Sequence, residues 1–332
     1  MKAFAKSFRC IVAIGISFCL LVATQSANAV QWVGGTGNWN TASNWSNNAV
    51  PSGANDYGIN NQGTAIIDSA ASSVNDILLG WNANNQREGH LEIQTGGSIT
   101  TTTTDGVYVG VKSTSTMSTL LVSGGSLTTT GGGWVMIGDE TSSQGTVTLS
   151  SGSISIGGDL VVGRAGEGNL VIQGSLGSIT VAEDLSFHVT SSAFSRLFVE
   201  IDAAGISPIQ VAAVTTLDNS PELNVSLSAL APTSDLVLVD SSPTGSIVLG
   251  TTFFGLADGA PVSATLGLTT YNWTIDYDYG TDNNDIALVF VSVETVPEPG
   301  TATLGGLGMV VFSFVAARRR RARANQTINA QV

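Results

Sequence analysis

Short aliphatic segments recur along the middle of the chain at near-constant distances. Three apolar residues followed by glycine occur four times, at residues 77–80, 107–110, 135–138 and 160–163. A fifth copy without the glycine occupies residues 185–187. The five copies start 30, 28, 25 and 25 residues apart. Self-similarity at such a spacing predicts a repeat architecture in which each unit packs on the next.

Two further elements lie between these copies. The first is an alternating segment at residues 91–93, 120–122, 147–149 and 170–172, and the second begins with Gly-Ser at residues 97–100, 125–128, 152–155 and 177–180. Three short strands per unit predict an all-β fold, a right-handed parallel β-helix over residues 77–187. A series of antiparallel hairpins forming a sandwich is the alternative.

Period-two alternation predicts which side chains face the interior of this solenoid. Residues two apart in a strand point to the same side. The predicted inward pairs are Leu91 with Ile93, Leu120 with Val122, Val147 with Leu149, and Leu170 with Ile172. The pattern resembles the autotransporter-type and pectin-lyase-like repeats of bacterial surface proteins. That resemblance implies stacked coils joined by parallel ladders.

The first 29 residues have the three-part order of a secretory signal peptide. Lys2, Lys6 and Arg9 precede an apolar run at residues 10–23, and Ala27 and Ala29 form a small-residue cleavage site for signal peptidase. The apolar run is shorter than the roughly 20 residues that a membrane span needs. The sequence therefore predicts export with removal of residues 1–29.

The other end of the chain also has three parts in fixed order. The motif Val296, Pro297, Glu298 and Pro299 is followed by an uncharged apolar run at residues 301–317 and by Arg318, Arg319, Arg320 and Arg321. Each proline fixes its own φ and disfavours helix in the residue before it, so the motif is extended. The apolar run predicts a transmembrane helix, with the arginines on the cytoplasmic side.

This order resembles the PEP-CTERM sorting domain of Gram-negative bacteria. The resemblance implies that a membrane-embedded exosortase recognises the motif and removes the tail. Residues 296–321 would be the sorting signal, and residues 322–332 a cytoplasmic tail. The protein would be anchored transiently in the inner membrane and then reach the cell surface or the extracellular space. A plain C-terminal anchor that is never cut is the alternative.

Two flanking regions enclose the repeats. Residues 30–76 contain Trp32, Trp39 and Trp45 and resemble the opening of many repeat-bearing PEP-CTERM and autotransporter-like proteins. Tryptophans serve either to cap the open end of a solenoid or, when exposed, to stack on sugars. Capping is the prediction. Residues 188–295 predict a β-rich closing domain, and alternation at residues 275–279 and 286–290 predicts its hairpin.

Acidic residues crowd the turn of that hairpin. Asp276, Asp278, Asp282 and Asp285 lie within ten residues, and clustered carboxylates suit calcium. The spacing of an EF-hand is absent, and aspartate favours turns in any case. The prediction is therefore that these aspartates form an ordinary turn, and calcium binding is the alternative.

Composition limits the classes of partner that the mature protein can bind. Both cysteines, Cys10 and Cys19, lie in the predicted signal peptide, so the mature protein has no thiol or disulfide. Residues 30–299 hold four basic side chains against all 25 acidic ones, a net charge of about −21. Such a surface disfavours nucleic acid and anionic lipid. No cofactor motif is found.

No catalytic motif stands out in the sequence. A glycosidase needs two suitably spaced carboxylates, and a lyase needs a base with a neutralising cation. No spacing singles out a pair among the candidates, which are Asp159, Glu183, Asp184, Arg164, Arg196, His90 and His188. The expectation is therefore a non-catalytic structural or adhesive protein of the cell surface or biofilm matrix, with exopolysaccharide or other matrix components as partners. A β-helix lyase or glycosidase acting on polysaccharide is the alternative.

Overall fold

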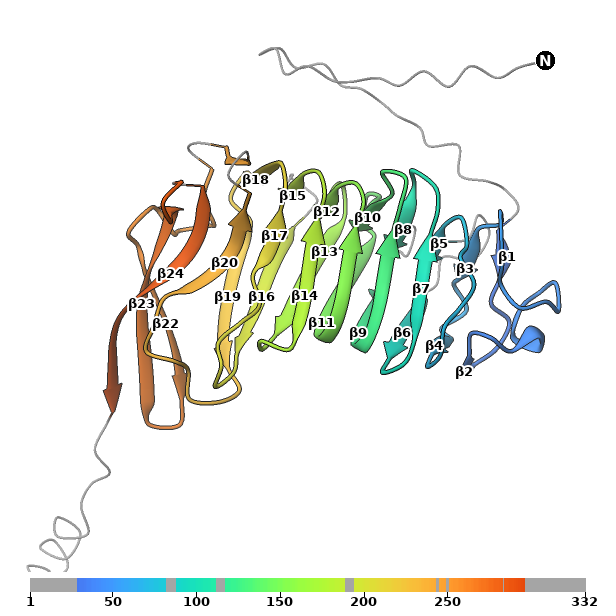
Figure 1. The fold of residues 1–332 in the computed structure, drawn as a ribbon, viewed down its shortest axis with the longest axis horizontal. Coiled ribbons are helices and arrows are strands. Elements are labelled where there is room, and N and C mark those ends of the chain that lie inside the picture. The colour runs from blue at the N-terminus through green and yellow to red at the C-terminus, as the bar shows by residue number, and fades with distance from the viewer. Residues whose placement is uncertain are drawn as a thin grey trace, which may run out of the picture.

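The protein is an elongated, almost entirely β structure in which the chain winds from one end to the other (Figure 1). The computed structural model describes residues 29–81, 88–111, 117–188, 194–242, 245–248, 251–282 and 284–295. The predicted signal peptide, apart from Ala29, and the whole predicted sorting signal and tail lie outside these residues.

One face of the solenoid is a ladder of nine parallel strands, each contributed by a successive turn of the chain. The apolar triplets with a following glycine form its central strands. In order along the axis the strands are β1 (Val30–Gln31), β3 (Tyr57–Ile59), β5 (Ile77–Leu79), β8 (Gly106–Val109), β10 (Trp134–Ile137), β12 (Leu160–Val162), β15 (Leu185–His188), β18 (Val214–Asp218) and β21 (Ser246–Ile247).

The second predicted element forms a second parallel ladder. Its strands are β2 (Thr36–Asn38), β4 (Thr64–Ile67), β6 (His90–Gln94), the first halves of β9 (Met117–Thr129) and β11 (Gln144–Ile156), β13 (Glu167–Gln173), β16 (Ser195–Ile201) and β19 (Glu222–Leu227). Each turn thus continues from the first ladder into the second.

The Gly-Ser element forms the third ladder. It comprises β7 (Ser98–Thr101), the second halves of β9 and β11, β14 (Gly177–Val181), β17 (Ile209–Val211) and β20 (Leu236–Ser241). Register shifts near residues 123–126 and 149–153 mark where the two long strands bend from one ladder into the next. The parallel solenoid is confirmed, and the antiparallel sandwich is wrong for this region.

Aliphatic side chains stack in register inside the solenoid. The eight predicted inward residues are each 2% exposed or less. Leu91 pairs with Leu120, which pairs with Val147, which pairs with Leu170. Full burial of such a side chain contributes about 1.5–3 kcal/mol, so these columns replace disulfides as the source of stability.

The ladders extend beyond residues 77–187 in both directions. At the N-terminal side β1 and β3 already belong to the first ladder, and at the C-terminal side β18 and β21 continue it. The repeat-like sequence therefore covers only the middle of the solenoid. In the outer coils the same register is kept by less regular sequences, because a strand needs only inward apolar side chains to join the stack.

The three tryptophans of the first coil are buried and not available to stack on sugars. Trp32, Trp39 and Trp45 are each 1% exposed or less. Their rings meet edge to face, with Trp45 lying 5.0 Å from Trp32 and 4.7 Å from Trp39 between centroids. The indole of Trp45 donates to the Trp39 carbonyl oxygen at 2.8 Å. They close the open end of the core, beside the 3-10 helix η1 (Ala42–Asn44).

The C-terminal end is closed by an antiparallel sheet. β24 (Asp285–Thr295) pairs with β20 of the third ladder and with β23 (Thr269–Tyr279), which pairs in turn with β22 (Pro261–Leu266). The alternating Ile275, Tyr277, Ile286 and Leu288 are buried, as the predicted closing hairpin requires. Parallel stacking thus ends where antiparallel pairing covers the last coil.

Candidate functional site

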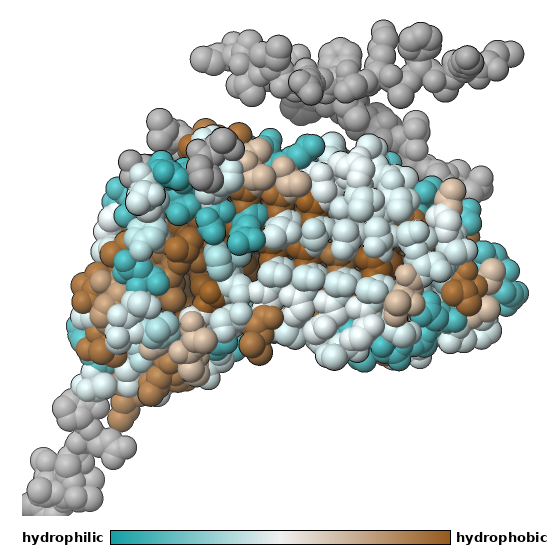
Figure 2. All heavy atoms as spheres, in the orientation of Figure 1, coloured by the Kyte–Doolittle hydropathy of each residue, from teal (hydrophilic) through white to brown (hydrophobic). Residues whose placement is uncertain are grey.

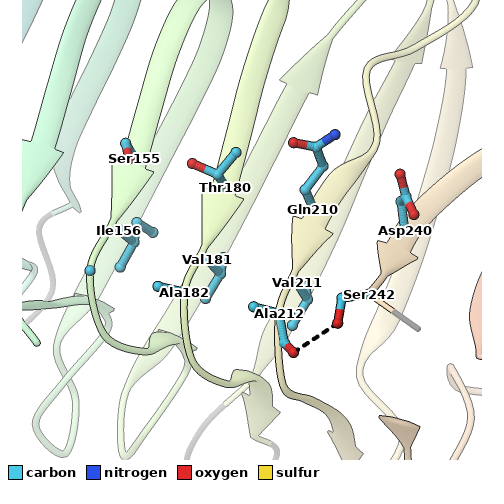
Figure 3. Close-up of a pocket in the computed structure, with 11 residues that line it drawn as sticks. Ser155, Ile156, Thr180, Val181, Ala182, Gln210, Val211, Ala212, Asp240 and Ser242 are labelled. Atoms are coloured by element: carbon cyan, nitrogen blue, oxygen red, sulfur yellow. Dashed lines mark hydrogen bonds between the residues drawn. The ribbon is translucent and has the colours of Figure 1, made fainter. Parts of the chain in front are cut away.

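A groove of about 470 Å³ crosses four neighbouring coils at the end of the third ladder (Figure 3). Its upper row consists of Ser155, Thr180, Gln210 and Asp240, which are paired in register along the axis. Figure 3 shows these polar side chains in one line across the strands, with Ile156, Val181 and Val211 beside them. The groove therefore runs along the solenoid, perpendicular to the strands.

Small residues keep the groove open. Ala182 and Ala212 are exposed at equivalent positions in adjacent coils, and Gly157 occupies the equivalent position in the preceding coil. A Cβ on Gly157 would lie 2.7 Å from the Thr129 carbonyl oxygen, so a side chain there requires a backbone shift. The hydroxyl of Ser242 donates to the Ala212 carbonyl oxygen at 3.2 Å and orders the last coil of the groove.

The side chains that line the groove are mostly uncharged. Among the described residues that line it, Asp240 is the one charged side chain. The other polar groups are hydroxyls and one amide, which both donate and accept hydrogen bonds. The lining is therefore mostly uncharged and able to hydrogen-bond.

The acidic candidates from the sequence lie on a turn outside the groove lining. Asp159 accepts a hydrogen bond from the backbone N–H of Asp184 at 2.9 Å. Asp184 accepts one from Val214 at the same distance. Burial raises the pKa of Asp159. These two carboxylates connect adjacent coils, whereas Glu183 is exposed beside them.

Both arginine candidates are held by carboxylates. The guanidinium Nε of Arg164 lies 2.6 Å from Asp139 Oδ1. Arg196 bridges Glu167 and Glu222 from the coils on either side, with its Nε 2.8 Å from Glu222 Oε2. The lining of the groove contains neither arginine and none of the carboxylates of Asp159, Glu183 and Asp184.

The two histidines also bridge neighbouring coils. His90 Nδ1 lies 2.8 Å from Thr119 Oγ1, and burial lowers the pKa of His90. His188 Nδ1 lies 3.0 Å from Asp218 Oδ2, its register partner in the next strand. These contacts favour a role in coil stacking for both side chains.

Sequence reasoning missed two buried carboxylates on the turns. Asp76 is 8% exposed, and its Oδ1 accepts from the Gly106 backbone N–H at 2.8 Å and from the Thr103 hydroxyl. Asp139 is 3% exposed beside Arg164. Burial raises the pKa of each to about 6. The available signal was an aspartate next to a buried strand, which by itself does not distinguish a buried carboxylate from an exposed turn residue.

Two of the four aspartates of the predicted calcium alternative accept separate backbone hydrogen bonds. Asp276 Oδ1 accepts from the Asp278 backbone N–H at 2.9 Å, as in an Asx turn. Asp285 Oδ1 accepts from the Ser241 backbone N–H at 2.8 Å. Across the described ranges, no three His, Cys, Asp or Glu side chains converge to hold a metal ion, Asp282 included. Calcium binding at this turn stays the alternative to an ordinary turn.

The described β fold extends to the residue before the predicted sorting motif. β24 extends to Thr295, which pairs with Thr269 of β23, and the next residue in the sequence is Val296. No helix in the described part of the chain has the length and apolarity to cross a membrane. The predicted span at residues 301–317, the motif residues and the arginines at 318–321 all fall outside that part.

Comparison with known proteins identifies the C-terminal segment. No curated protein matches the chain. A family model described as the PEP-CTERM protein-sorting motif matches residues 295–321. This match covers the Pro-Glu-Pro motif, the apolar run and the four arginines, and it implies export to the cell envelope or surface and processing by an exosortase. The chain is therefore a β-solenoid that carries a PEP-CTERM protein-sorting motif at residues 295–321.

Proposed function

We propose that the mature protein is a non-catalytic structural or adhesive component of the cell surface or extracellular matrix, and that it holds a linear matrix polymer in the groove. The observation that carries this proposal is the groove across four coils, with its row of two hydroxyls, one amide and the carboxylate of Asp240. Exopolysaccharide is the polymer whose hydroxyl groups suit that row best.

The spacing of the coils supports a linear ligand. Parallel strands lie about 4.8 Å apart, so the four polar side chains of the row repeat at about that distance over roughly 14 Å. A polymer that runs along the axis meets one polar side chain per coil. Individual contacts of this kind are weak, and binding gains strength when several are made at once.

The alternative function is a polysaccharide lyase or glycosidase built on the same solenoid. A glycosidase needs a general acid and a second carboxylate about 5–10 Å apart. The groove has one carboxylate among its described lining residues, and the nearby Asp159 and Asp184 already accept backbone hydrogen bonds. These features favour binding without cleavage.

Two processing steps complete the proposal. Signal peptidase removes residues 1–29, and the apolar run at 301–317 holds the precursor in the inner membrane with Arg318 to Arg321 inside. The exosortase then reads Val296 to Pro299. Release places the solenoid at the surface, where the high negative charge keeps it soluble.

Filling the groove tests the binding site. Ala182→Trp adds a large side chain at an exposed position of the groove, so it should leave the fold intact and reduce co-sedimentation with exopolysaccharide from the native matrix by about tenfold, a loss of about 1.4 kcal/mol. Thr148→Trp, on the outer face of the second ladder, is the matched control and should bind as wild type does.

The same samples separate binding from catalysis. Reducing ends and unsaturated products should not accumulate during incubation with the polymer. Product formation that Ala182→Trp abolishes would establish the enzyme alternative. Equal sedimentation of all three proteins would show that the groove is not the polymer site.

A further inference from the structure

Apolar side chains gather at the end of the molecule from which the chain continues into the sorting motif. Leu268 in the β22–β23 turn is 48% exposed, and Val291 and Val293 of β24 are 58% and 42% exposed. Thr269 pairs with Thr295, so the turn lies beside the end of β24. We call Leu268, Val291 and Val293 the apolar tip. Figure 2 shows brown, hydrophobic surface over this end of the molecule.

The pairing of strands explains why these side chains are exposed. The first half of β24 lies between β20 and β23, but its pairing with β20 involves only residues 286–288. Beyond that point β24 pairs on one side, with β23. Val293 lies opposite Tyr271, which is buried on a strand paired on both sides, whereas Val293 lies on the edge strand and remains open to solvent.

The length of the following segment places the tip near a membrane. Five residues, 296–300, separate Thr295 from the apolar run at 301–317. Five residues reach at most about 17 Å when fully extended. The polar interface of a bilayer extends several ångströms beyond its hydrocarbon core. A precursor anchored by residues 301–317 must therefore hold the β22–β23 turn close to the lipid headgroups.

The charge around the apolar tip indicates which lipid headgroups it can contact. From Ser263 to Asn272 the sequence has no charged residue, and the hydroxyls of Thr265 and Thr270 lie 3.0 Å apart across the hairpin. Glu294 is the nearest carboxylate along β24. An uncharged turn with threonine hydroxyls, flanked by the exposed carboxylate of Glu294, suits zwitterionic headgroups, and the acidic protein as a whole disfavours anionic lipid.

We propose that the apolar tip inserts into the interface of the bilayer that anchors the precursor. This inference rests on the proposed membrane anchoring of residues 301–317. The anchor supplies a high effective concentration, so a few aliphatic side chains suffice where they would not recruit a free protein. Insertion holds the end of β24 at the lipid surface and fixes the height of the Pro-Glu-Pro motif for the enzyme that reads it.

Site-specific fluorescence tests the proposal on the full chain. Cys10 and Cys19 are replaced by serine, so Leu268→Cys provides a single site for an environment-sensitive nitrobenzoxadiazole label. The labelled chain is reconstituted in phosphatidylcholine vesicles that contain a headgroup-proximal nitroxide lipid. Thr148→Cys, on the side of the solenoid, is the control label. Buried aliphatic groups lie about 5–10 Å into the interface, so quenching at position 268 should exceed that at position 148 by about twofold or more.

Each alternative gives a different result. Vesicle flotation with equal, weak quenching at both positions would overturn the tip proposal and leave membrane anchoring intact. Failure of both labelled chains to float would overturn the anchoring as well. A blue-shifted label at position 268 that responds to protein concentration but not to the nitroxide lipid would show contact with a second copy, and would also overturn insertion. Thermal unfolding monitored by circular dichroism confirms that both cysteine variants are folded.

Discussion

Asp76 and Asp139 are the two carboxylic acids of the described residues whose pKa is raised furthest from its ordinary value. Each carboxyl lies on a turn between ladders, largely removed from water, and burial raises the pKa of each to about 6. For Asp139 the nearby Arg164 guanidinium offsets part of that rise, whereas Glu140 adds to it. The folded protein therefore binds protons more tightly at these two residues than the unfolded chain does.

This property predicts a pH dependence of stability. Because the folded-state pKa of Asp139 lies above the unfolded value of 3.8, its contribution to stability is fully present below pH 3.8 and is lost as the pH rises through about 6. The free energy of unfolding should therefore be greater at pH 5 than at pH 7.5, with Asp139 contributing up to about 3 kcal/mol over its full titration. Urea unfolding at the two pH values measures the difference.

Matched variants separate this effect from general charge repulsion. Asp139→Asn cannot titrate and should reduce the difference between pH 5 and pH 7.5. Asp278→Asn removes the same charge from an exposed side chain and should leave the difference nearly as in wild type. If Asp139→Asn retains the full wild-type difference, the buried carboxyl is not its source.

Stacked columns of inward side chains hold the elements together. Leu149 pairs in register with Val122 on one side and Ile172 on the other, and is 1% exposed. Each coil contacts mainly its neighbours, so a gap in one column weakens two interfaces. The backbone ladder remains, because a side-chain truncation leaves the N–H and C=O groups paired.

Truncation of one column residue tests this arrangement. Leu149→Ala should lower the free energy of unfolding by about 2–5 kcal/mol, since it removes buried methyl groups and leaves a cavity. Thr148→Ala, one residue earlier and facing outward, should change it by no more than about 0.5 kcal/mol. Urea denaturation followed by circular dichroism compares the two. Similar losses for both variants would contradict the inward assignment of Leu149.

The strands of the solenoid show which buried positions the sequence could and could not predict. Alternation identified Leu120, Val147 and Leu149 as inward, because one side of each strand must be apolar. It did not identify the coils beyond residues 77–187, where repeat spacing fades while register persists. Nor did it reveal that Leu78 and Met136 are buried on the outer side of the first ladder, with Trp81, Val111, Tyr108 and Val161.

The groove was equally hidden from the sequence. Its row joins Ser155, Thr180, Gln210 and Asp240, which are separated by 25, 30 and 30 residues and share no motif. Only the register of the coils makes them neighbours. The candidates chosen by residue type, such as Asp159 and Arg164, instead make structural contacts, because carboxylates and guanidinium groups on turns readily satisfy backbone groups and each other.

At the scale of the whole molecule, the first and last strands of the described fold lie at opposite ends of the solenoid. β1 and the tryptophan cluster lie at one end of the long axis, and the antiparallel sheet with the exit of β24 lies at the other (Figure 1). A precursor anchored through its C-terminal segment therefore has the closing sheet next to the membrane and the solenoid as a projection from it. The groove, on the side of the solenoid, remains accessible in that arrangement.

Processing of the C-terminal segment is the prediction on which the functional proposal depends most. Export carries residues 30–295 across the membrane until the apolar run at 301–317 stops transfer and the four arginines hold the tail inside. β24 extends to Thr295, and the proline residues of the motif that follows in the sequence disfavour helix. The mature protein should therefore begin near Val30 and end near residues 297–300.

Replacement of one motif residue distinguishes cleavage from permanent anchoring. Glu298→Ala keeps the apolar run and the arginines but removes the charged centre of the motif, so uncut protein should accumulate in the membrane fraction. Pro261→Ala, at the start of β22, leaves the motif intact and should be processed as wild type is. Intact-mass measurement of each variant from the native host shows whether its C-terminal segment has been removed. Wild-type protein that still carries residues 301–332 would contradict cleavage, because a plain anchor leaves the wild type and Glu298→Ala equally intact and equally bound to the membrane.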